Sequence, residues 1–189
     1  MGLAIVQEFE GRYKNGKLQV YFLPAGDGGG SYEIAGINDR YHPSKAEQLK
    51  TFIDLGQHKA AEKEAAAYII EYTNPVLKFF PSPELAEANP DVEFILRDCA
   101  FNRGAKGAAT ILQLALGVPV DGIVGSYTKQ AFGIALSGPF VGELTKARRT
   151  YEQTSYPWKK STRQPGNKFW PGLENRWVKA ETVSKTLLA

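Results

Sequence analysis

The apolar positions near the N-terminus follow a helical period. On a helix over residues 3–13, at about 100° per residue, four side chains share one face: Leu3, Val6, Glu10 and Tyr13. Glu8 points the opposite way. Glu10 therefore lies within the stripe that we expect to face a core or a cleft. Because an apolar surface is a costly place for a carboxylate, Glu10 is a candidate for a special role.

The pattern changes to that of β-structure after residue 16. Residues 17–23 are rich in β-branched and aromatic side chains, and residues 24–30 are rich in glycine with one proline. Residues 31–37 can return as a second strand. The sequence therefore predicts a β-hairpin over 17–37 with a glycine-rich tip.

Helical spacing of apolar residues dominates the rest of the chain. We expect helices over 44–55, 58–72, 91–102, 105–116, 126–136, 139–152 and 170–188. Ser44 is the expected N-cap of the first of these, with Glu47 as its capping-box partner and Gly56 as its stop. Four of the eleven prolines mark 74–90 as containing a connection. The predicted fold class is mainly α with one small β-hairpin.

Composition narrows the classes of function. The chain has 189 residues, 43% of them apolar, which suits one domain with a packed core. A net charge of +3 without a dense Lys/Arg run argues against a nucleic-acid binder, but it favours an anionic polymer surface. No apolar run reaches the roughly 18 residues that span a bilayer, and the N-terminal residues do not resemble a secretory signal, since no basic segment is followed by an apolar one.

The residues that bind metals are scarce. The chain has two histidines, His42 and His58, and one cysteine, so no intrachain disulfide can form. We expect Cys99 to be an inert core thiol on an apolar helix face and His42 to cap a turn. No metal site and no cofactor are predicted.

Three of the four carboxylates in the first 33 residues suit glycosidic chemistry. Cleavage of a glycosidic bond needs an acid that protonates the leaving oxygen and a second carboxylate that supports the cationic transition state or activates water. Burial lets a carboxyl group hold its proton near neutral pH, which fits Glu10 as the acid. Asp27 or Glu33 can be the second group. The alternatives are a Glu10 paired with Arg12 or Arg40 and a Glu33 that merely points outward from its strand.

These residues carry a resemblance to a known family. Glu10-Gly-Arg-Tyr13, then Asp27-Gly-Gly-Gly-Ser-Tyr-Glu-Ile-Ala-Gly-Ile37, then His42-Pro43 resemble the pattern of glycoside hydrolase family 108. Its members are muramidases of phage endolysins and of the secretion-activator group. The resemblance implies a lysozyme-like helical fold in which the hairpin forms a cleft wall. It also implies that Glu10 is the catalytic acid.

The chain departs from the family pattern at one position. The family has a threonine on the returning strand, whereas this chain has one extra residue and no threonine there. Counting back from Gly36 places Glu33 at that position, and counting forward from Asp27 places Tyr32 there. Glu33 can then act as nucleophile or base, and Tyr32 can bind substrate.

The C-terminal half resembles the peptidoglycan-binding part of the same family. The similar segments are Phe101-Asn-Arg-Gly104, Leu112-Gln113 and Val120-Asp-Gly-Ile-Val-Gly125. The resemblance allows contacts between sugar or stem peptide and three side chains: Asn102, Arg103 and Gln113. The alternative is that these residues only close turns between helices. The aromatic residues near the C-terminus either line a groove or fill the core.

The sequence thus predicts an N-acetylmuramidase that hydrolyses the β-1,4 bond between N-acetylmuramic acid and N-acetylglucosamine. A catalytic part over 1–90 and a peptidoglycan-binding part over 91–189 are expected to pack as one compact unit. The expected partner is the peptidoglycan glycan strand, bound by a monomer that is made in the cytoplasm and acts on the periplasmic wall after release. The alternatives are a peptidoglycan-binding protein without activity and a lytic transglycosylase.

Overall fold

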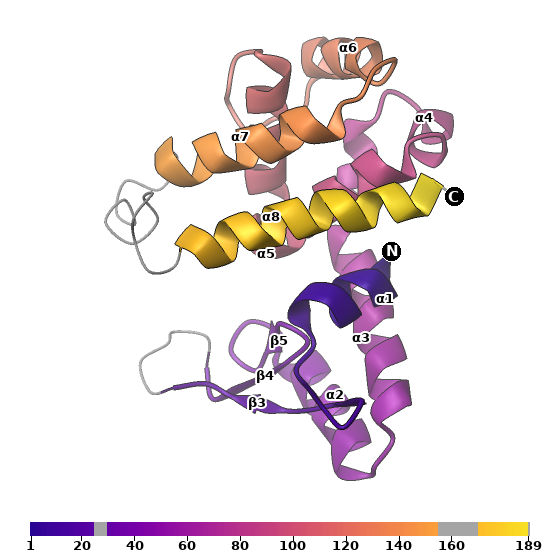
Figure 1. The fold of residues 1–189 in the computed structure, drawn as a ribbon, viewed down its shortest axis with the longest axis vertical. Coiled ribbons are helices and arrows are strands. Elements are labelled where there is room, and N and C mark those ends of the chain that lie inside the picture. Colours follow the sequence, from indigo (N-terminus) through magenta and orange to yellow (C-terminus); the bar gives the residue numbers. More distant parts are fainter. Residues whose placement is uncertain (25–29, 155–169, 189) are drawn as a thin grey trace. The chain divides into compact units, whose positions relative to one another are not determined.

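A computed structural model describes residues 1–24, 30–154 and 170–188. These residues form two compact units, Met1–Glu71 and Tyr72–Ala189 (Figure 1). Helices make up most of both units, and small antiparallel sheets occur in the first, which confirms the predicted mainly α class. The division of roles predicted at residue 90 stays a prediction.

The N-terminal helix differs from its prediction in length and in the face it buries. Helix α1 (Gly2–Ile5) continues as the π-helix η1 (Val6–Glu10) and ends there, so the predicted helix over 3–13 is too long. The buried residues are Gly2, Ile5 and Val6. Leu3 is 43% exposed. The wider turn of a π-helix breaks the 100° spacing on which the predicted face depended.

Two tight turns shape the β-structure of the first unit. Strands β1 (Tyr13–Lys14) and β2 (Lys17–Leu18) pair across Asn15-Gly16, where both φ angles are positive, as a type I′ turn requires. Strands β3 (Tyr21–Phe22), β4 (Tyr32–Ile34) and β5 (Ile37–Asn38) form a second sheet in the order β3-β4-β5. Ala35-Gly36 makes the same kind of turn between β4 and β5. The hairpin predicted over 17–37 is therefore present as β3 and β4, with β5 added to it, and a separate two-stranded sheet over 13–18 precedes it.

Two helices complete the first unit. Helix α2 (Pro43–Asp54) begins one residue earlier than predicted, because Pro43 occupies its first turn and His42 takes the N-cap position. Ser44 is therefore not the cap. Gly56, with φ 75°, ends the helix as predicted, and α3 (His58–Thr73) follows. The fully buried side chains of this core come from the sheet and both helices and include Ile34, Ile37, Leu49 and Ile69.

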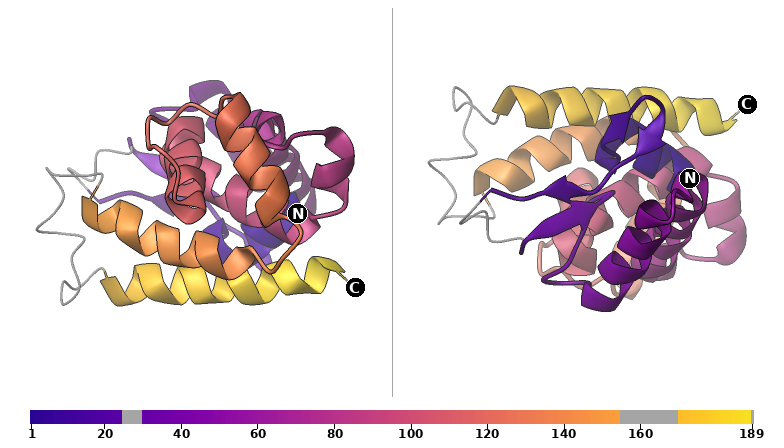
Figure 2. Two further views of the ribbon diagram at one scale, coloured as in Figure 1. Left: turned by 90° about the horizontal axis from the view of Figure 1, so that it is seen from above. Right: turned by 90° about the horizontal axis from the view of Figure 1, so that it is seen from below.

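The second unit is built around one long helix. Two short segments, η2 (Asn74–Phe79) and α4 (Pro83–Glu87), precede α5 (Pro90–Leu116). Gly104 has non-helical backbone angles and breaks α5 where the sequence predicted a break. Then follow α6 (Ser126–Ala135), α7 (Val141–Thr154), α8 (Trp170–Lys185) and η4 (Thr186–Leu188). Helices α7 and α8 lie side by side in all views (Figures 1 and 2).

Aromatic side chains fill the core of this unit. The rings of Phe80 and Phe140 both contact the ring of Phe132, with centroid distances of 4.9 Å and 5.6 Å. Trp170 and Trp177 are buried and meet edge to face at 5.5 Å. Their burial supports the core alternative for these two aromatic residues. Among the described helices, none is both long and apolar enough to cross a membrane.

Candidate functional site

Glu10 lies where the first helix gives way to the β-structure. It is the last residue of η1 and is partly buried. Gly11 follows in an extended conformation, and its N–H donates to the carbonyl oxygen of Val6 at 2.6 Å. A Cβ atom at Gly11 would overlap the ring of Tyr13. Only glycine therefore lets the chain turn this tightly after Glu10.

Tyr13 fastens that turn to helix α3. Its hydroxyl donates a hydrogen bond of 2.7 Å to Glu62, and Gln7 donates another of 2.9 Å to the same carboxylate oxygen. Burial raises the pKa of the Tyr13 hydroxyl, and the bond to Glu62 raises it further. The Glu10-Gly-Arg-Tyr13 motif thus holds the end of η1 in a fixed position against α3.

The register of the sheet separates the two residues that compete for the family's threonine position. Glu33 lies opposite Tyr21 on one side and Asn38 on the other, so these three share a face. Tyr32, one residue earlier, belongs to the other face. That face also carries Ile34, which is fully buried. Glu33 therefore lies on the face turned away from the core.

The surroundings of Tyr32 agree with this assignment. Burial raises the pKa of its hydroxyl; charges on Asp39, Glu47 and Asp54 add to the effect, and Lys50 opposes it. Because α2 contacts β4 and carries three of these charged residues, Tyr32 lies near α2. The predicted contact between Tyr32 and substrate stays a prediction, as does the catalytic role of Glu33.

Arg12 links the end of η1 to the Glu33 face. Its guanidinium carbon lies 5.0 Å from the centroid of the Tyr21 ring, within the range of a cation–π contact. Tyr21 is the cross-strand neighbour of Glu33. The segment that directly follows Glu10 thus contacts the row of residues that contains Glu33. Glu10 and Glu33 both have interaction partners within the protein.

Asp39 is a residue that the sequence reasoning missed. Its Oδ1 accepts hydrogen bonds from the N–H groups of Ser31, at 2.8 Å, and Tyr32, at 3.4 Å. Burial acts to raise the pKa of Asp39, but these bonds outweigh it and leave the pKa lowered. Gly30 has φ 106°, and a Cβ atom there would overlap Asp39 Oδ1. Asp39 thus fixes one end of the glycine-rich segment.

The other end of that segment is closed by the backbone. The N–H of Leu23 donates to the carbonyl oxygen of Ser31 at 2.9 Å. Asp27, the third carboxylate of the predicted site, lies outside the described residues. No sequence signal pointed to Asp39, because its contact with Ser31 depends on how the strands pair.

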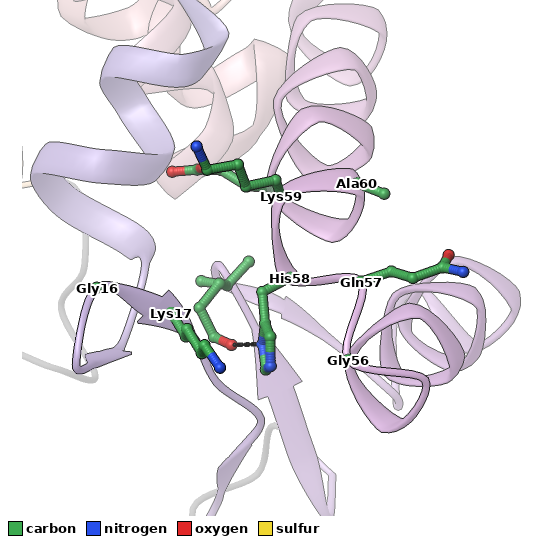
Figure 3. Close-up of a pocket in the computed structure, with 9 residues that line it drawn as sticks. Gly16, Lys17, Gly56, Gln57, His58, Lys59 and Ala60 are labelled. Atoms are coloured by element: carbon green, nitrogen blue, oxygen red, sulfur yellow. Dashed lines mark hydrogen bonds between the residues drawn. The ribbon is translucent and has the colours of Figure 1, made fainter.

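A cavity of about 290 Å³ opens elsewhere in the first unit (Figure 3). It lies between the turn at Gly16 and the connection from α2 to α3, and its described lining does not include Glu10, Tyr32 or Glu33. The Nδ1 atom of His58 bonds to the carbonyl oxygen of Leu18 at 2.8 Å, which joins the start of α3 to β2. His58 thus has a structural role in this place.

Gln113 is occupied within the protein. It is buried, and its Nε2 donates to Asp121 at 2.7 Å and to the carbonyl oxygen of Ile123 at 3.0 Å. Its Oε1 accepts from the N–H of Gly122 at 2.8 Å. These bonds hold the loop between α5 and α6, and they favour the structural alternative over contact with a sugar.

Asn102 and Arg103 contact neighbouring helical residues. The Asn102 amide donates to the carbonyl oxygen of Asp98 at 2.8 Å. The Arg103 Nε donates to Glu152 of α7 at 2.5 Å. Both residues line a small cavity of the second unit. Their predicted contact with sugar or stem peptide stays a prediction.

Neither histidine takes part in a metal site within the described part of the chain. There, no group of three or more His, Cys, Asp and Glu side chains could hold a metal ion. The Nδ1 of His42 shares a hydrogen bond of 2.8 Å with the Tyr68 hydroxyl. Burial lowers the pKa of His42.

The chain has the fold of a solved bacterial protein. SagA of Brucella abortus superimposes with a TM-score of 0.56 and 20% sequence identity, over 91% of this chain and 88% of that protein. At this identity the likeness concerns the fold alone. No protein-family model matches the chain, and no curated protein matches it significantly in sequence.

Proposed function

We propose that this protein is a peptidoglycan hydrolase, an N-acetylmuramidase in which Glu10 is the general acid. The observation that carries the proposal is the position of Glu10. It ends the first helix, the Gly11 turn and the Tyr13–Glu62 bond hold it there, and Arg12 connects it to the Glu33 face. The resemblance to glycoside hydrolase family 108 supplies the substrate, and the fold shared with SagA is compatible with it.

The chemistry assigns one task to each carboxyl group. Glu10 protonates the glycosidic oxygen of the leaving N-acetylglucosamine. Glu33 lies on the sheet face turned away from the core. It stabilises the charge that develops at the anomeric carbon of N-acetylmuramic acid, or it activates water. Asp27 is the alternative for this second task. The Tyr21 ring beside Glu33 is 38% exposed; since Arg12 lies over one face of it, a sugar ring would stack on the other face.

The proposal is tested by lysis of chloroform-treated Gram-negative cells, followed as loss of turbidity. We expect the wild-type chain to clear the suspension and Glu10→Gln to lose at least about 100-fold of the rate, which is the scale of general acid catalysis. Glu8→Gln is the matched control, because Glu8 lies on the same helical segment and is exposed. Near-normal lysis by Glu10→Gln refutes the assignment of the acid.

The second carboxylate is identified by a parallel pair of variants. Glu33→Gln is expected to lose activity, whereas Tyr32→Phe keeps the ring on the α2 side and is expected to keep most of it. If Asp27→Asn loses activity and Glu33→Gln does not, the second task belongs to Asp27.

Two other functions are compatible with the absence of the threonine that the family pattern has. A peptidoglycan-binding protein without activity would sediment with purified wall sacculi without releasing fragments. A lytic transglycosylase needs only one acid and leaves an anhydro-sugar end. Mass spectrometry of the released fragments separates it from a muramidase, since hydrolysis adds the mass of one water molecule.

A further inference from the structure

A small cavity of about 20 Å³ lies between α5, α7 and α8 of the second unit. The charged residues that line it are Arg103, Arg148, Arg176 and Glu152. None of these side chains has a part in the proposed hydrolysis. The cavity is therefore a feature that needs its own explanation.

Cationic side chains outnumber carboxylates around the cavity. Asp98 is fully buried and accepts bonds of 2.6 Å from both Arg148 and Arg176. Arg103 pairs with Glu152. These five side chains comprise three guanidinium groups and two carboxylates, so the surroundings favour an anion over a cation.

Arg148 supplies the donor that an anion in this cavity would use. This side chain is 95% buried, and its Nη2 atom is bound to Asp98. Its Nη1 atom is also buried and has no hydrogen-bond partner among the described residues. A guanidinium N–H group that is buried and unbonded is a strong donor for an anion.

We propose that this cavity is a binding site for a single halide ion, which the Nη1 group of Arg148 holds. The volume sets the size of the ligand, because a cavity of about 20 Å³ takes one particle of about the size of a water molecule. Phosphate, sulfate and the carboxylate tail of a peptide are larger. The positive charge of the Arg148 guanidinium requires the ligand to be an anion.

The proposal gives the ion a structural role. The residues around it come from α5, α7 and α8, so a bound halide places a negative charge beside arginine side chains of all three helices. A ligand that binds only the folded state raises its stability until the site is saturated. The unfolding temperature should then depend on the identity of the anion as well as on ionic strength.

The first experiment is thermal unfolding of the full chain, followed by tryptophan fluorescence, in sodium chloride or sodium gluconate at equal ionic strength. We expect chloride to raise the unfolding temperature by roughly 2–5 °C with a saturable dependence, and gluconate to lack this effect. Equal curves in the two salts overturn the proposal.

The second experiment locates the ion directly. Crystals grown in sodium bromide are expected to show an anomalous peak at hydrogen-bond distance from Arg148 Nη1. A peak without anomalous signal, which means a water molecule, overturns the proposal.

The matched variants are Arg148→Lys and Arg149→Lys. Lysine at 148 can still pair with Asp98 but lacks the second guanidinium donor, so we expect a folded protein without the chloride-specific rise. Arg149, its neighbour on α7, is partly exposed and pairs with Glu174 instead. Arg149→Lys is expected to keep the rise, and a rise that persists in Arg148→Lys contradicts the proposal.

Discussion

Replacing Asp98 by Asn should destabilise the second unit more than any change of a surface charge. The Asp98 carboxylate is fully buried and holds two guanidinium groups at 2.6 Å. Asparagine keeps the shape and one acceptor, but it removes the charge. Arg148, itself 95% buried, then loses the anion with which it pairs.

The magnitude follows from two arguments. Burial acts to raise the pKa of Asp98, but Arg176 and Arg148 outweigh it and lower the pKa from 3.8 to about 2. That difference corresponds to roughly 2 kcal/mol of stability from the ionised form. Leaving one partner of a buried ion pair uncompensated costs about 3–5 kcal/mol in other proteins. We therefore expect a loss of about 3–5 kcal/mol, or roughly 12–20 °C in unfolding temperature.

The dependence on pH tests the same reasoning. Because the folded pKa of Asp98 lies below its unfolded value, the carboxylate contributes fully above pH 4, and this contribution is lost as the pH falls toward 2. The difference in unfolding temperature between the wild type and Asp98→Asn should narrow over that window. All three tryptophans lie in the sequence after residue 157, so their fluorescence follows the second unit.

A surface pair provides the control. Glu143 and Lys146 form an ion pair on α7 whose side chains are at least half exposed. Glu143→Gln should cost less than about 1 kcal/mol. If Asp98→Asn costs no more than Glu143→Gln, or if its effect is the same at pH 2.5 and pH 7, the account of the buried cluster is wrong.

Three further predictions concern other groups. Burial raises the pKa of the Cys99 thiol to about 11, so it should react with an aromatic disulfide reagent only when the protein unfolds, whereas fast reaction of the folded chain would contradict its burial. Gly30→Ala should destabilise the first unit in urea by roughly 1–2 kcal/mol, because alanine strains φ 106° and overlaps Asp39; an unchanged midpoint would refute this. Burial lowers the pKa of His42, so stability should fall as the pH drops below 6.5, and a His42→Gln variant should lose that dependence.

The sequence predicted the helical elements well where apolar spacing and glycine stops coincide. Gly56 ends α2, and Gly104 interrupts α5, at the predicted residues. Both have positive φ, which only glycine adopts at little cost. The closing helix at 170–188 was also found, as α8 followed by η4.

The prediction failed where geometry departs from the regular period. The π-helix at Val6–Glu10 shifts the buried face, and nothing in the residue types announces it. The Asn15-Gly16 turn did carry a signal, since Asn-Gly between two strands is typical of a type I′ hairpin. The apolar spacing predicted a helix over 3–13, so residue 13 was not recognised as part of a strand before this turn.

The candidate site was predicted only in part. The catalytic roles of Glu10 and Glu33 came from their residue types and from the family resemblance, and they stay predictions. That Glu33 and Tyr32 lie on opposite faces of the sheet could be known only from the strand register. Asp39 could not be predicted, because its bond to Ser31 joins positions brought together by pairing. The buried Asp98 cluster depends on contacts 50 and 78 residues apart, which local patterns cannot show.

The central claim is that Glu10 donates a proton to a glycosidic oxygen, and one measurement tests it most directly. Purified peptidoglycan is digested with the wild type, with Glu10→Gln and with Glu8→Gln, and the soluble fragments are analysed by mass spectrometry. We predict fragments with a reducing N-acetylmuramic acid end from the wild type and from Glu8→Gln, and none from a folded Glu10→Gln. The same fragments in equal yield from Glu10→Gln would contradict the account.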